Sequence, residues 1–177
     1  MTPIVCTCWN VSMLTNSGGV LHTDYRALFR NVPGPVTVVT GVENGVAHAT
    51  TVSSFSSLSL TPAYALVVLD LTSRMLGVIE RTGRLGINLL ADDQSDVGRQ
   101  CSSKADDKMD TVDWTFTDEL PQITDSAGWL ACEAAQIIEV GDHKIVVAQP
   151  YRIQPSDRSP LLYHRAAFHL VGKTPTP

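Results

Sequence analysis

The sequence has 177 residues, of which 44% are hydrophobic and 18% are charged, a composition that predicts one folded domain with a real core rather than a disordered chain. Its formal net charge of −5 argues against general nucleic-acid binding, which needs a basic face. No apolar run approaches the roughly 20 residues of a membrane helix. Residues 1–23 also lack the Lys or Arg that starts a secretory signal, so we expect a cytoplasmic protein without a membrane segment.

Residues 1–22 have no clear period and predict a tail or arm ahead of a domain at 23–172, with a short C-terminal tail at 173–177. Thr23 is the expected N-cap of the first helix. The helix has one apolar face at i, i+3, i+4 and i+7 and ends at Pro33. That face consists of Tyr25, Leu28, Phe29 and Val32.

A hairpin follows this helix. Residues 36–42 form a β-branched run, Asn44-Gly45 is a strong hairpin signal, and residues 46–52 predict the return strand. A serine-rich loop then leads to another strand at residues 65–69.

The middle of the chain predicts two helices around one strand. Ser73 is the expected cap of a helix through Glu80 that ends near Gly83, and alternating apolar residues predict a strand from Leu85 to Leu89. Asp92 or Asp93 is the expected cap of a helix over residues 95–101. Polar residues at 103–127, with Asp106 among them, predict a surface excursion pinned by Trp114 and Phe116.

Two long extended runs, at residues 129–140 and 144–153, flank the two-residue turn Gly141-Asp142. A last strand is expected at residues 161–170, on which His164 and His169 would point to opposite faces. Many short strands with tight turns and a few helices predict a mainly β protein, a small barrel with helices packed outside it.

Several sites are absent from the sequence. It contains no dinucleotide-binding or phosphate-binding glycine motif, no catalytic serine elbow and no metal-binding histidine spacing. Cys6, Cys8, Cys101 and Cys132 show no zinc-site spacing, so we expect free thiols and no metal.

Two segments are candidate ligand sites. Residues 48–62 place hydroxyls and backbone amides just after a strand, where they could surround an anionic or carbonyl-rich ligand, although the same composition fits a flexible loop. His143 follows the Gly141-Asp142 turn at the expected rim of the barrel, where it could reach a ligand or simply face solvent.

Four segments in order resemble the short-chain flavin reductases, the FMN-binding split-barrel components of two-component monooxygenases. They are residues 35–40, the hydroxyl-rich residues 48–62, the strand Gly86-Ile87-Asn88-Leu89-Leu90, and Gly141-Asp142-His143 with the later Pro160-Leu161-Leu162-Tyr163. The resemblance covers about Asp24 to Leu170 and implies a split β-barrel. Departures from the pattern are Ala49 in place of Gly, Thr61-Pro62-Ala63 in place of Asp-Pro-Pro, and Cys101-Ser102 in place of Phe-Ala.

The resemblance also implies roles for particular residues. His143 and Tyr163 would contact the nicotinamide nucleotide, and no residue is assigned to covalent or acid–base catalysis. Ser73 at the helix N-terminus would meet a flavin phosphate, with Arg74 adding charge. The flavin would be bound by Thr51, Val52, Ser53, Ser54, Ser57, Leu58, Ser59, Ser73, Arg74, Asn88, Cys101 and Ser102.

The expected activity is NAD(P)H-dependent reduction of FAD or FMN, with FAD and NADH preferred. Reduced flavin would pass to a partner flavin-dependent monooxygenase, and the chain would form a homodimer. We expect few cations near the site, so the protein would bind flavin loosely. The alternatives are a flavin-binding electron carrier and an oxidase of the pyridoxamine-phosphate type on the same fold.

Overall fold

The computed structural model describes residues 20–105 and 107–172. The predicted C-terminal tail, Asp106, Cys6, Cys8 and all but the last three residues of the predicted N-terminal tail lie outside this part of the chain. Within it, no helix is long and apolar enough to cross a bilayer.

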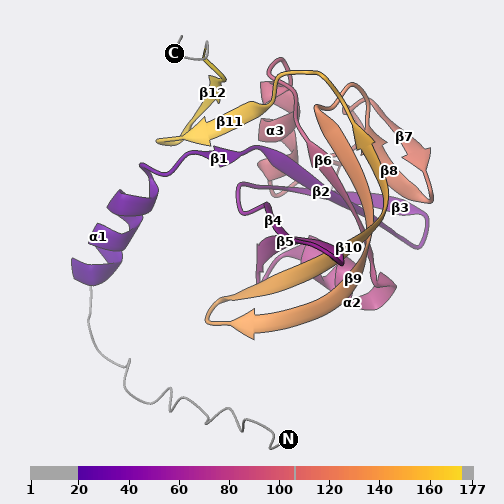
Figure 1. The fold of residues 1–177 in the computed structure, drawn as a ribbon, viewed down its shortest axis with the longest axis horizontal. Helices are drawn as coiled ribbons and strands as arrows, with labels where there is room; N and C mark the ends of the chain where they lie inside the picture. The colour runs from indigo at the N-terminus through magenta and orange to yellow at the C-terminus, as the bar shows by residue number, and fades with distance from the viewer. Residues whose placement is uncertain (1–19, 106, 173–177) are drawn as a thin grey trace, which may run out of the picture.

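The described residues form three helices and twelve strands, mainly β as predicted (Figure 1). The helices are α1 (Val20–Phe29), α2 (Arg74–Thr82) and α3 (Ser95–Ser102). The strands of the first half are β1 (Gly34–Pro35), β2 (Thr37–Glu43), β3 (Val46–Val52), β4 (Ser56–Leu60), β5 (Ala63–Asp70) and β6 (Arg84–Leu89). The later strands are β7 (Trp114–Thr117), β8 (Leu120–Ile123), β9 (Gly128–Val140), β10 (His143–Pro155), β11 (Leu161–His164) and β12 (Ala167–Leu170).

Seven strands form one sheet in the order β3-β2-β6-β9-β10-β5-β4. Its two outer strands, β3 and β4, are joined by residues 53–55 alone. Four Cα steps span at most about 14 Å, whereas the outer strands of a flat seven-stranded sheet would lie about 29 Å apart. The sheet must therefore curl until the end of β3 and the start of β4 lie close together. It remains open between β3 and β4, which is a barrel with a split.

Two buried clusters hold the curled sheet in place. Val39 of β2 belongs to the cluster beneath α2, which includes Met75 and Ile79. The neighbouring Val38 belongs to the second cluster, beneath α3 and the segment that follows it. Because successive side chains of a strand point to opposite faces, β2 is buried on both sides and forms the centre of the fold.

Local signals place several elements correctly. Asn44 and Gly45 both have positive φ, at 51° and 78°, and join β2 to β3 as predicted. Gly83 ends α2 with φ of 70° and its N–H on the Ile79 carbonyl at 2.8 Å. The Gly141-Asp142 turn joins β9 and β10, the longest strands of the fold.

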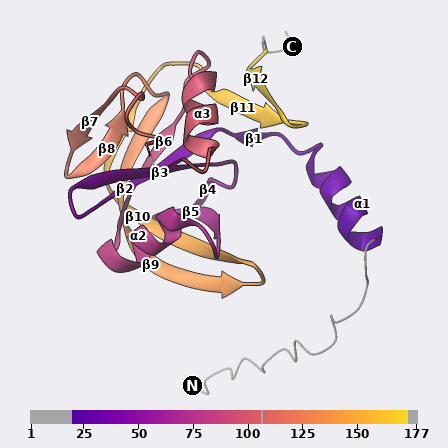
Figure 2. The same ribbon diagram turned by 180° about the vertical axis from the view of Figure 1, so that it is seen from behind.

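The first helix differs from its prediction. Thr23 is inside α1 rather than its cap, because the helix begins at Val20. All four residues of its predicted apolar face are exposed, Tyr25 and Leu28 by 59% and 63%, so the face does not pack on the domain. Both views show α1 projecting away from the sheet (Figures 1 and 2).

Two predicted loops contain strands. Half of the serine-rich segment is β4, because its backbone from Ser56 to Leu60 pairs with β5, the next strand along the chain. The excursion at 103–127 contains the β7–β8 hairpin, in which Ile123 is buried while Phe116 is 57% exposed. Trp114 packs against the second cluster, so only one of the two predicted anchors is in contact with the core.

The cap of α3 is Gln94, and not Asp92 or Asp93. The Gln94 side chain accepts the Ala91 N–H at 2.9 Å and donates to the Thr124 carbonyl at 2.8 Å. Asp93 instead forms an ion pair with Arg158 at 2.5 Å.

The predicted last strand is a hairpin of β11 and β12. Arg165 and Ala166 form its turn with positive φ of 49° and 62°, a conformation that neither residue type signals in a sequence. The hairpin brings the rings of His164 and His169 to 5.6 Å from one another, so the prediction of opposite faces is wrong.

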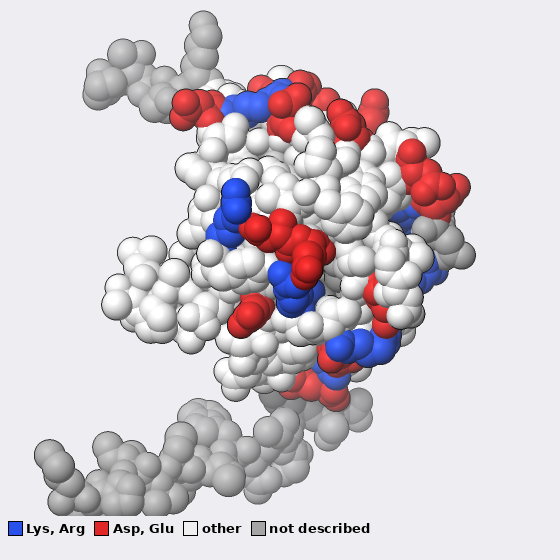
Figure 3. All heavy atoms as spheres, turned by 90° about the vertical axis from the view of Figure 1, so that its right-hand side faces the viewer, with Lys and Arg blue, Asp and Glu red and all other residues white. Residues whose placement is uncertain are grey.

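Charged side chains on the surface are largely paired. Arg84 forms an ion pair with Glu119 at 2.6 Å, and Arg152 pairs with Asp118 at 3.2 Å. On the right-hand side of the molecule, basic and acidic residues lie close together on a largely uncharged surface (Figure 3).

Candidate functional site

Strand β3 borders two hollows that meet at Ser102. The first, which we call the cationic hollow, encloses about 370 Å³ between β3, the start of α2 and the end of α3. Its basic side chains are Arg74, Lys104 and Lys108, with His48 beside them. It is lined by Ala47, His48, Ala49, Thr50, Asp70, Thr72, Ser73, Arg74, Met75, Ser102, Ser103, Lys104, Ala105 and Lys108.

The second, which we call the neutral hollow, encloses about 250 Å³ and contains no charged side chain. Hydroxyl groups and two aromatic rings supply its chemistry. It is lined by Pro35, Val36, Thr51, Val52, Ser53, Gly98, Ser102, Tyr163 and Phe168. A ligand that combines a phosphate with a flat, uncharged ring would find a suitable surface in each hollow.

The N-terminus of α2 opens into the cationic hollow. Ser73 is the N-cap, and its side chain makes no capping hydrogen bond to the helix. The first backbone N–H groups of a helix lack partners within the helix and attract anions. Ser73, Arg74 and this helix end could therefore hold an anion, which is the role predicted for these two residues.

The turn before α2 is held by Asp70. Its carboxylate accepts hydrogen bonds from the Thr72 hydroxyl at 2.6 Å and from the Thr72 N–H at 2.7 Å, and these bonds lower the pKa of Asp70. Asp70 stays ionised at neutral pH, so its two hydrogen bonds hold the turn that leads into α2.

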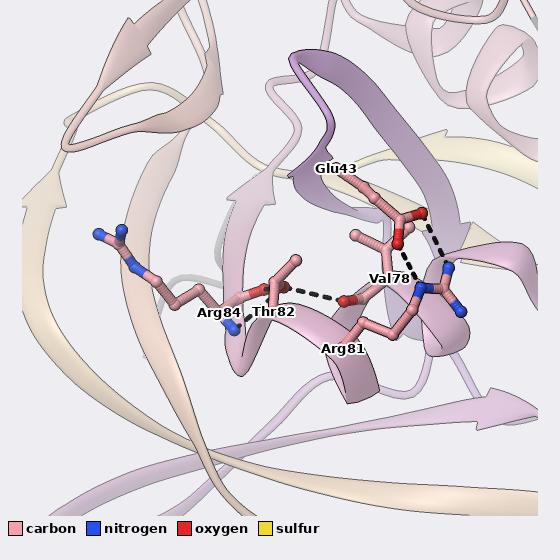
Figure 4. Close-up of polar contacts among 5 residues, drawn as sticks. All are labelled: Glu43, Val78, Arg81, Thr82 and Arg84. Atoms are coloured by element: carbon pink, nitrogen blue, oxygen red, sulfur yellow. Dashed lines mark hydrogen bonds and ion pairs between the residues drawn. The ribbon is translucent and has the colours of Figure 1, made fainter.

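The other end of α2 is tied to the β2–β3 hairpin (Figure 4). Arg81 donates two hydrogen bonds to the carboxylate of Glu43, which is the last residue of β2. Thr82 donates its hydroxyl to the Val78 carbonyl at 2.8 Å. These contacts hold the helix so that its N-terminus faces the cationic hollow.

His143 lies next to the cationic hollow. It is the Cα partner of Asp70 in the β10–β5 ladder, and the Asp142 carbonyl accepts the N–H of Leu71 at 3.1 Å. The imidazole Nδ1 is 2.7 Å from the Asp142 carboxylate. That hydrogen bond lowers the pKa of Asp142 and orients the ring.

The serine-rich bend is bonded to β5, the strand that also pairs with His143. Ser54 donates its hydroxyl to the Val68 carbonyl at 3.0 Å and accepts the Val68 N–H at 2.9 Å. Val68 is two residues before Asp70 on β5, which is about 7 Å along a strand. The serine-rich bend and the Gly141-Asp142 turn are therefore brought close together in the fold.

The predicted site residues lie in several places, and His143 itself lines neither hollow. Thr51, Val52, Ser53, Ser102 and Tyr163 line the neutral hollow, and Ser73, Arg74 and Ser102 line the cationic one. Ser54 uses its hydroxyl to complete the edge of β5, in place of a backbone partner. Ser57, Leu58 and Ser59 lie on β4, outside both hollows.

Asn88 and Cys101 need correction, because both are fully buried. The Asn88 amide donates to the Val38 carbonyl and the Thr40 hydroxyl, both at 3.2 Å, and accepts the Ile123 N–H at 2.7 Å. It joins β2, β6 and β8 inside the core and has no surface left for flavin. Cys101 is packed in the second cluster, where burial raises the pKa of its thiol to about 11.

The structure also adds residues that the sequence did not indicate. His48, Lys104 and Lys108 line the cationic hollow, so the expectation of few cations there is wrong. Phe168 lines the neutral hollow from β12, which was predicted as part of a single last strand. Only His48, inside the hydroxyl-rich segment, had a local signal. No group of three or more metal-ligating side chains occurs among the described residues.

Comparison with known proteins identifies the family. Residues 29–172 match the family model described as "Flavin reductase like domain". A "Probable flavin reductase" of Rhizobium meliloti (strain 1021) is 35% identical over 78% of this chain and 46% of that protein. This chain thus spans about half the length of that relative.

Two other proteins match over most of their length. The reductase component of 4-nitrophenol 4-monooxygenase/4-nitrocatechol 2-monooxygenase from Rhodococcus opacus is 31% identical over 86% of this chain and 85% of that protein. The NADH:FAD oxidoreductase SgcE6 of Streptomyces globisporus C-1027, solved with NAD and FAD fragments, has a TM-score of 0.82 and 25% identity, covering 88% of this chain and 95% of that one.

These matches and the split, curled sheet define a mainly β protein with the fold of flavin reductases. The chain belongs to the flavin reductase-like family.

Proposed function

We propose that this protein is an NAD(P)H:flavin oxidoreductase that reduces FAD or FMN and supplies reduced flavin to a partner monooxygenase. The observation that carries the proposal is the junction at Ser102 between the cationic hollow and the neutral hollow. A flavin nucleotide has the matching chemistry, since it joins a phosphate to a flat ring with carbonyl and nitrogen edges.

Each part of the chain has a role in this proposal. Arg74, Lys104 and the N-terminus of α2 hold the phosphate, while Ser53 and Ser102 contact the ring. His143, oriented by Asp142, binds the nicotinamide nucleotide from the neighbouring strand. Flavin, when bound, accepts the hydride that NAD(P)H gives up, so the chain needs no nucleophile or general base of its own.

The relatives support a partner oxygenase, because the Rhodococcus opacus protein is named as the reductase component of a monooxygenase. We infer that the reduced flavin reaches such a partner by diffusion, in the cytoplasm. FAD and NADH are the preferred pair in this proposal, in line with the name of the Streptomyces globisporus relative.

We also infer a homodimer, from the apolar surface that the described chain leaves uncovered. Val67 and Val146 point into the core, so their neighbours in the β5–β10 ladder point outward. These half-buried neighbours are Leu66, Val68, Ile145 and Val147. Leu58 and Leu60 of β4, 50% and 87% exposed, add exposed apolar side chains on the neighbouring edge strand.

The experiment that tests the proposed function is the steady-state oxidation of NADH and of NADPH with FAD and with FMN as acceptors. We expect turnover with flavin added and the highest kcat/KM for NADH with FAD. A protein that binds flavin but oxidises neither nicotinamide would be an electron carrier instead, and the reductase proposal would be wrong.

A further inference from the structure

The C-terminal hairpin places an aromatic ring between two hollows. Phe168, on β12, lines the neutral hollow and also a neighbouring one beneath α3. It is half-buried, and no sequence pattern assigns it a role. A residue at such a boundary either packs the core or meets a ligand.

The Phe168 ring is fixed by its protein neighbours. The guanidinium of Arg99 lies over the ring, 5.3 Å from its centroid. The Tyr163 ring meets it edge-on, with centroids 5.8 Å apart at 61°. A methyl group on Gly98 would lie only 3.2 Å from the Phe168 Cζ, so α3 approaches the ring closely. An aromatic ring fixed in this way loses little entropy when a ligand packs on it.

The remaining surface of the ring faces a hollow whose chemistry suits an aromatic ligand. Every lining side chain of the neutral hollow is uncharged. Ser102 donates its hydroxyl to the Arg99 carbonyl at 2.7 Å and keeps its oxygen as an acceptor. Flat heteroaromatic rings pack well on an aromatic side chain and need only a few hydrogen-bonding groups at their edges.

We propose that Phe168 is the wall on which the flavin ring packs in the neutral hollow, and that it determines the affinity for the ring. This inference rests on the proposed function and assigns the ring, rather than the phosphate, to this part of the site. Arg99 is a positioning residue that holds Phe168 from behind, and Tyr163 limits its movement from the side.

The test is a binding titration with lumiflavin, which has the flavin ring and no phosphate, followed by flavin fluorescence. Phe168→Ala and Phe168→Leu should each weaken lumiflavin binding about 5- to 10-fold, whereas Phe168→Tyr should stay within about 2-fold. The affinity for FAD should decrease by the same factor, and the KM for NADH should not change. Phe116→Ala, which removes an exposed ring from β7, is the matched control and should bind like the wild type.

Phe168→Leu keeps the apolar packing of the side chain, so its thermal midpoint should stay close to that of the wild type even if Phe168→Ala unfolds. A folded Phe168→Leu protein with wild-type affinity for lumiflavin would overturn the inference and leave the reductase proposal intact. A wild-type protein that neither binds nor reduces flavin would overturn both.

Discussion

His143 is the residue through which the Gly141-Asp142 turn reaches the site. Its Nδ1 hydrogen bond with Asp142 fixes the ring, and its backbone pairs with Asp70 at the border of the cationic hollow. The role proposed for it is binding, because hydride transfer needs no proton from the protein.

His143→Ala should therefore raise the KM for NADH about 10-fold, the loss of roughly one hydrogen bond, and leave kcat within about 2-fold. Steady-state kinetics at saturating flavin measure both constants. His169→Ala, on the C-terminal hairpin, is the control and should match the wild type. Complete loss of hydride transfer with normal binding of both nucleotides would show that His143 is not a binding group.

The two buried thiols should make the free energy of unfolding decrease at alkaline pH. Burial raises the pKa of Cys101 from 9.0 to about 11 and that of Cys132 from 9.0 to about 12. In the unfolded chain both thiols ionise above pH 9, while in the folded chain they stay protonated. The free energy of unfolding should thus be unaffected by the thiols below pH 9 and fall between pH 9 and 11.

The expected slope is up to about 1.4 kcal/mol per pH unit for each thiol. Urea unfolding at pH 8, 9, 10 and 11 measures it, and a Cys101→Ala, Cys132→Ala double variant should lose this part of the slope. If the double variant and the wild type have parallel pH profiles, the thiols do not cause the decline.

Among the elements, β4 shows how a side chain can take the place of a strand residue. The register of β4 on β5 begins at Ser56 opposite Leu66, so the next outward backbone groups of β5, those of Val68, lie beyond its reach. Ser54 supplies both missing hydrogen bonds with one hydroxyl.

Ser54→Ala should lower the free energy of unfolding by about 1–3 kcal/mol, because it leaves the N–H and C=O of Val68 without partners. Urea denaturation of the flavin-free protein measures this loss. Ser56→Ala, whose hydroxyl contacts only the exposed Ser57 carbonyl, should change stability by less than about 0.5 kcal/mol. Equal effects at the two positions would contradict this role of Ser54.

The sequence predicted the elements that carry their own turn signals. Asn44-Gly45, Gly83 and Gly141-Asp142 all tolerate or favour positive φ, and the helix and strands beside them were correct. The turn at Arg165-Ala166 has the same backbone shape without such residues, so β11 and β12 were merged. The strand β4 was missed for another reason, since its pairing depends on β5 and not on its own serines.

The site residues also divide into those with a local sequence signal and those without one. Ser53, Ser73 and Arg74 lie in or beside segments with a local pattern and were expected to bind flavin. Lys104 and Phe168 reach the hollows only because α3 packs on β3 and the C-terminal hairpin pairs with β1, which local patterns do not encode. Asn88 was misjudged because its strand was correct while its direction, into the core, was not.

At the scale of the whole molecule, α1 stands apart, because its apolar face is exposed in the described chain. The Arg165 N–H binds the Arg30 carbonyl at 3.1 Å, and the Arg165 side chain binds Asn31 at 2.8 Å. These bonds hold the residues just after α1, while its apolar face stays exposed. A second copy of the chain would supply the missing cover in the homodimer that we infer.

Mass photometry of the wild type should then give twice the chain mass of 19.1 kDa. A Leu28→Glu, Phe29→Glu double variant should be largely monomeric at the same concentration, because charged groups at a buried contact cost several kcal/mol. Val46→Glu is the control, since Val46 is also exposed and begins β3, whose hairpin with β2 lies on the other side of the fold from α1 (Figure 1). A monomeric wild type would contradict the homodimer.

The link at residues 53–55 has a consequence for how this protein can change. Surface loops usually accept extra residues at little cost, but here three residues draw together the first and last strands of a seven-stranded sheet. One added residue would let these strands part and would shift Ser53 away from the neutral hollow. Libraries meant to alter the flavin preference of this protein should therefore vary side chains along the link and keep its length.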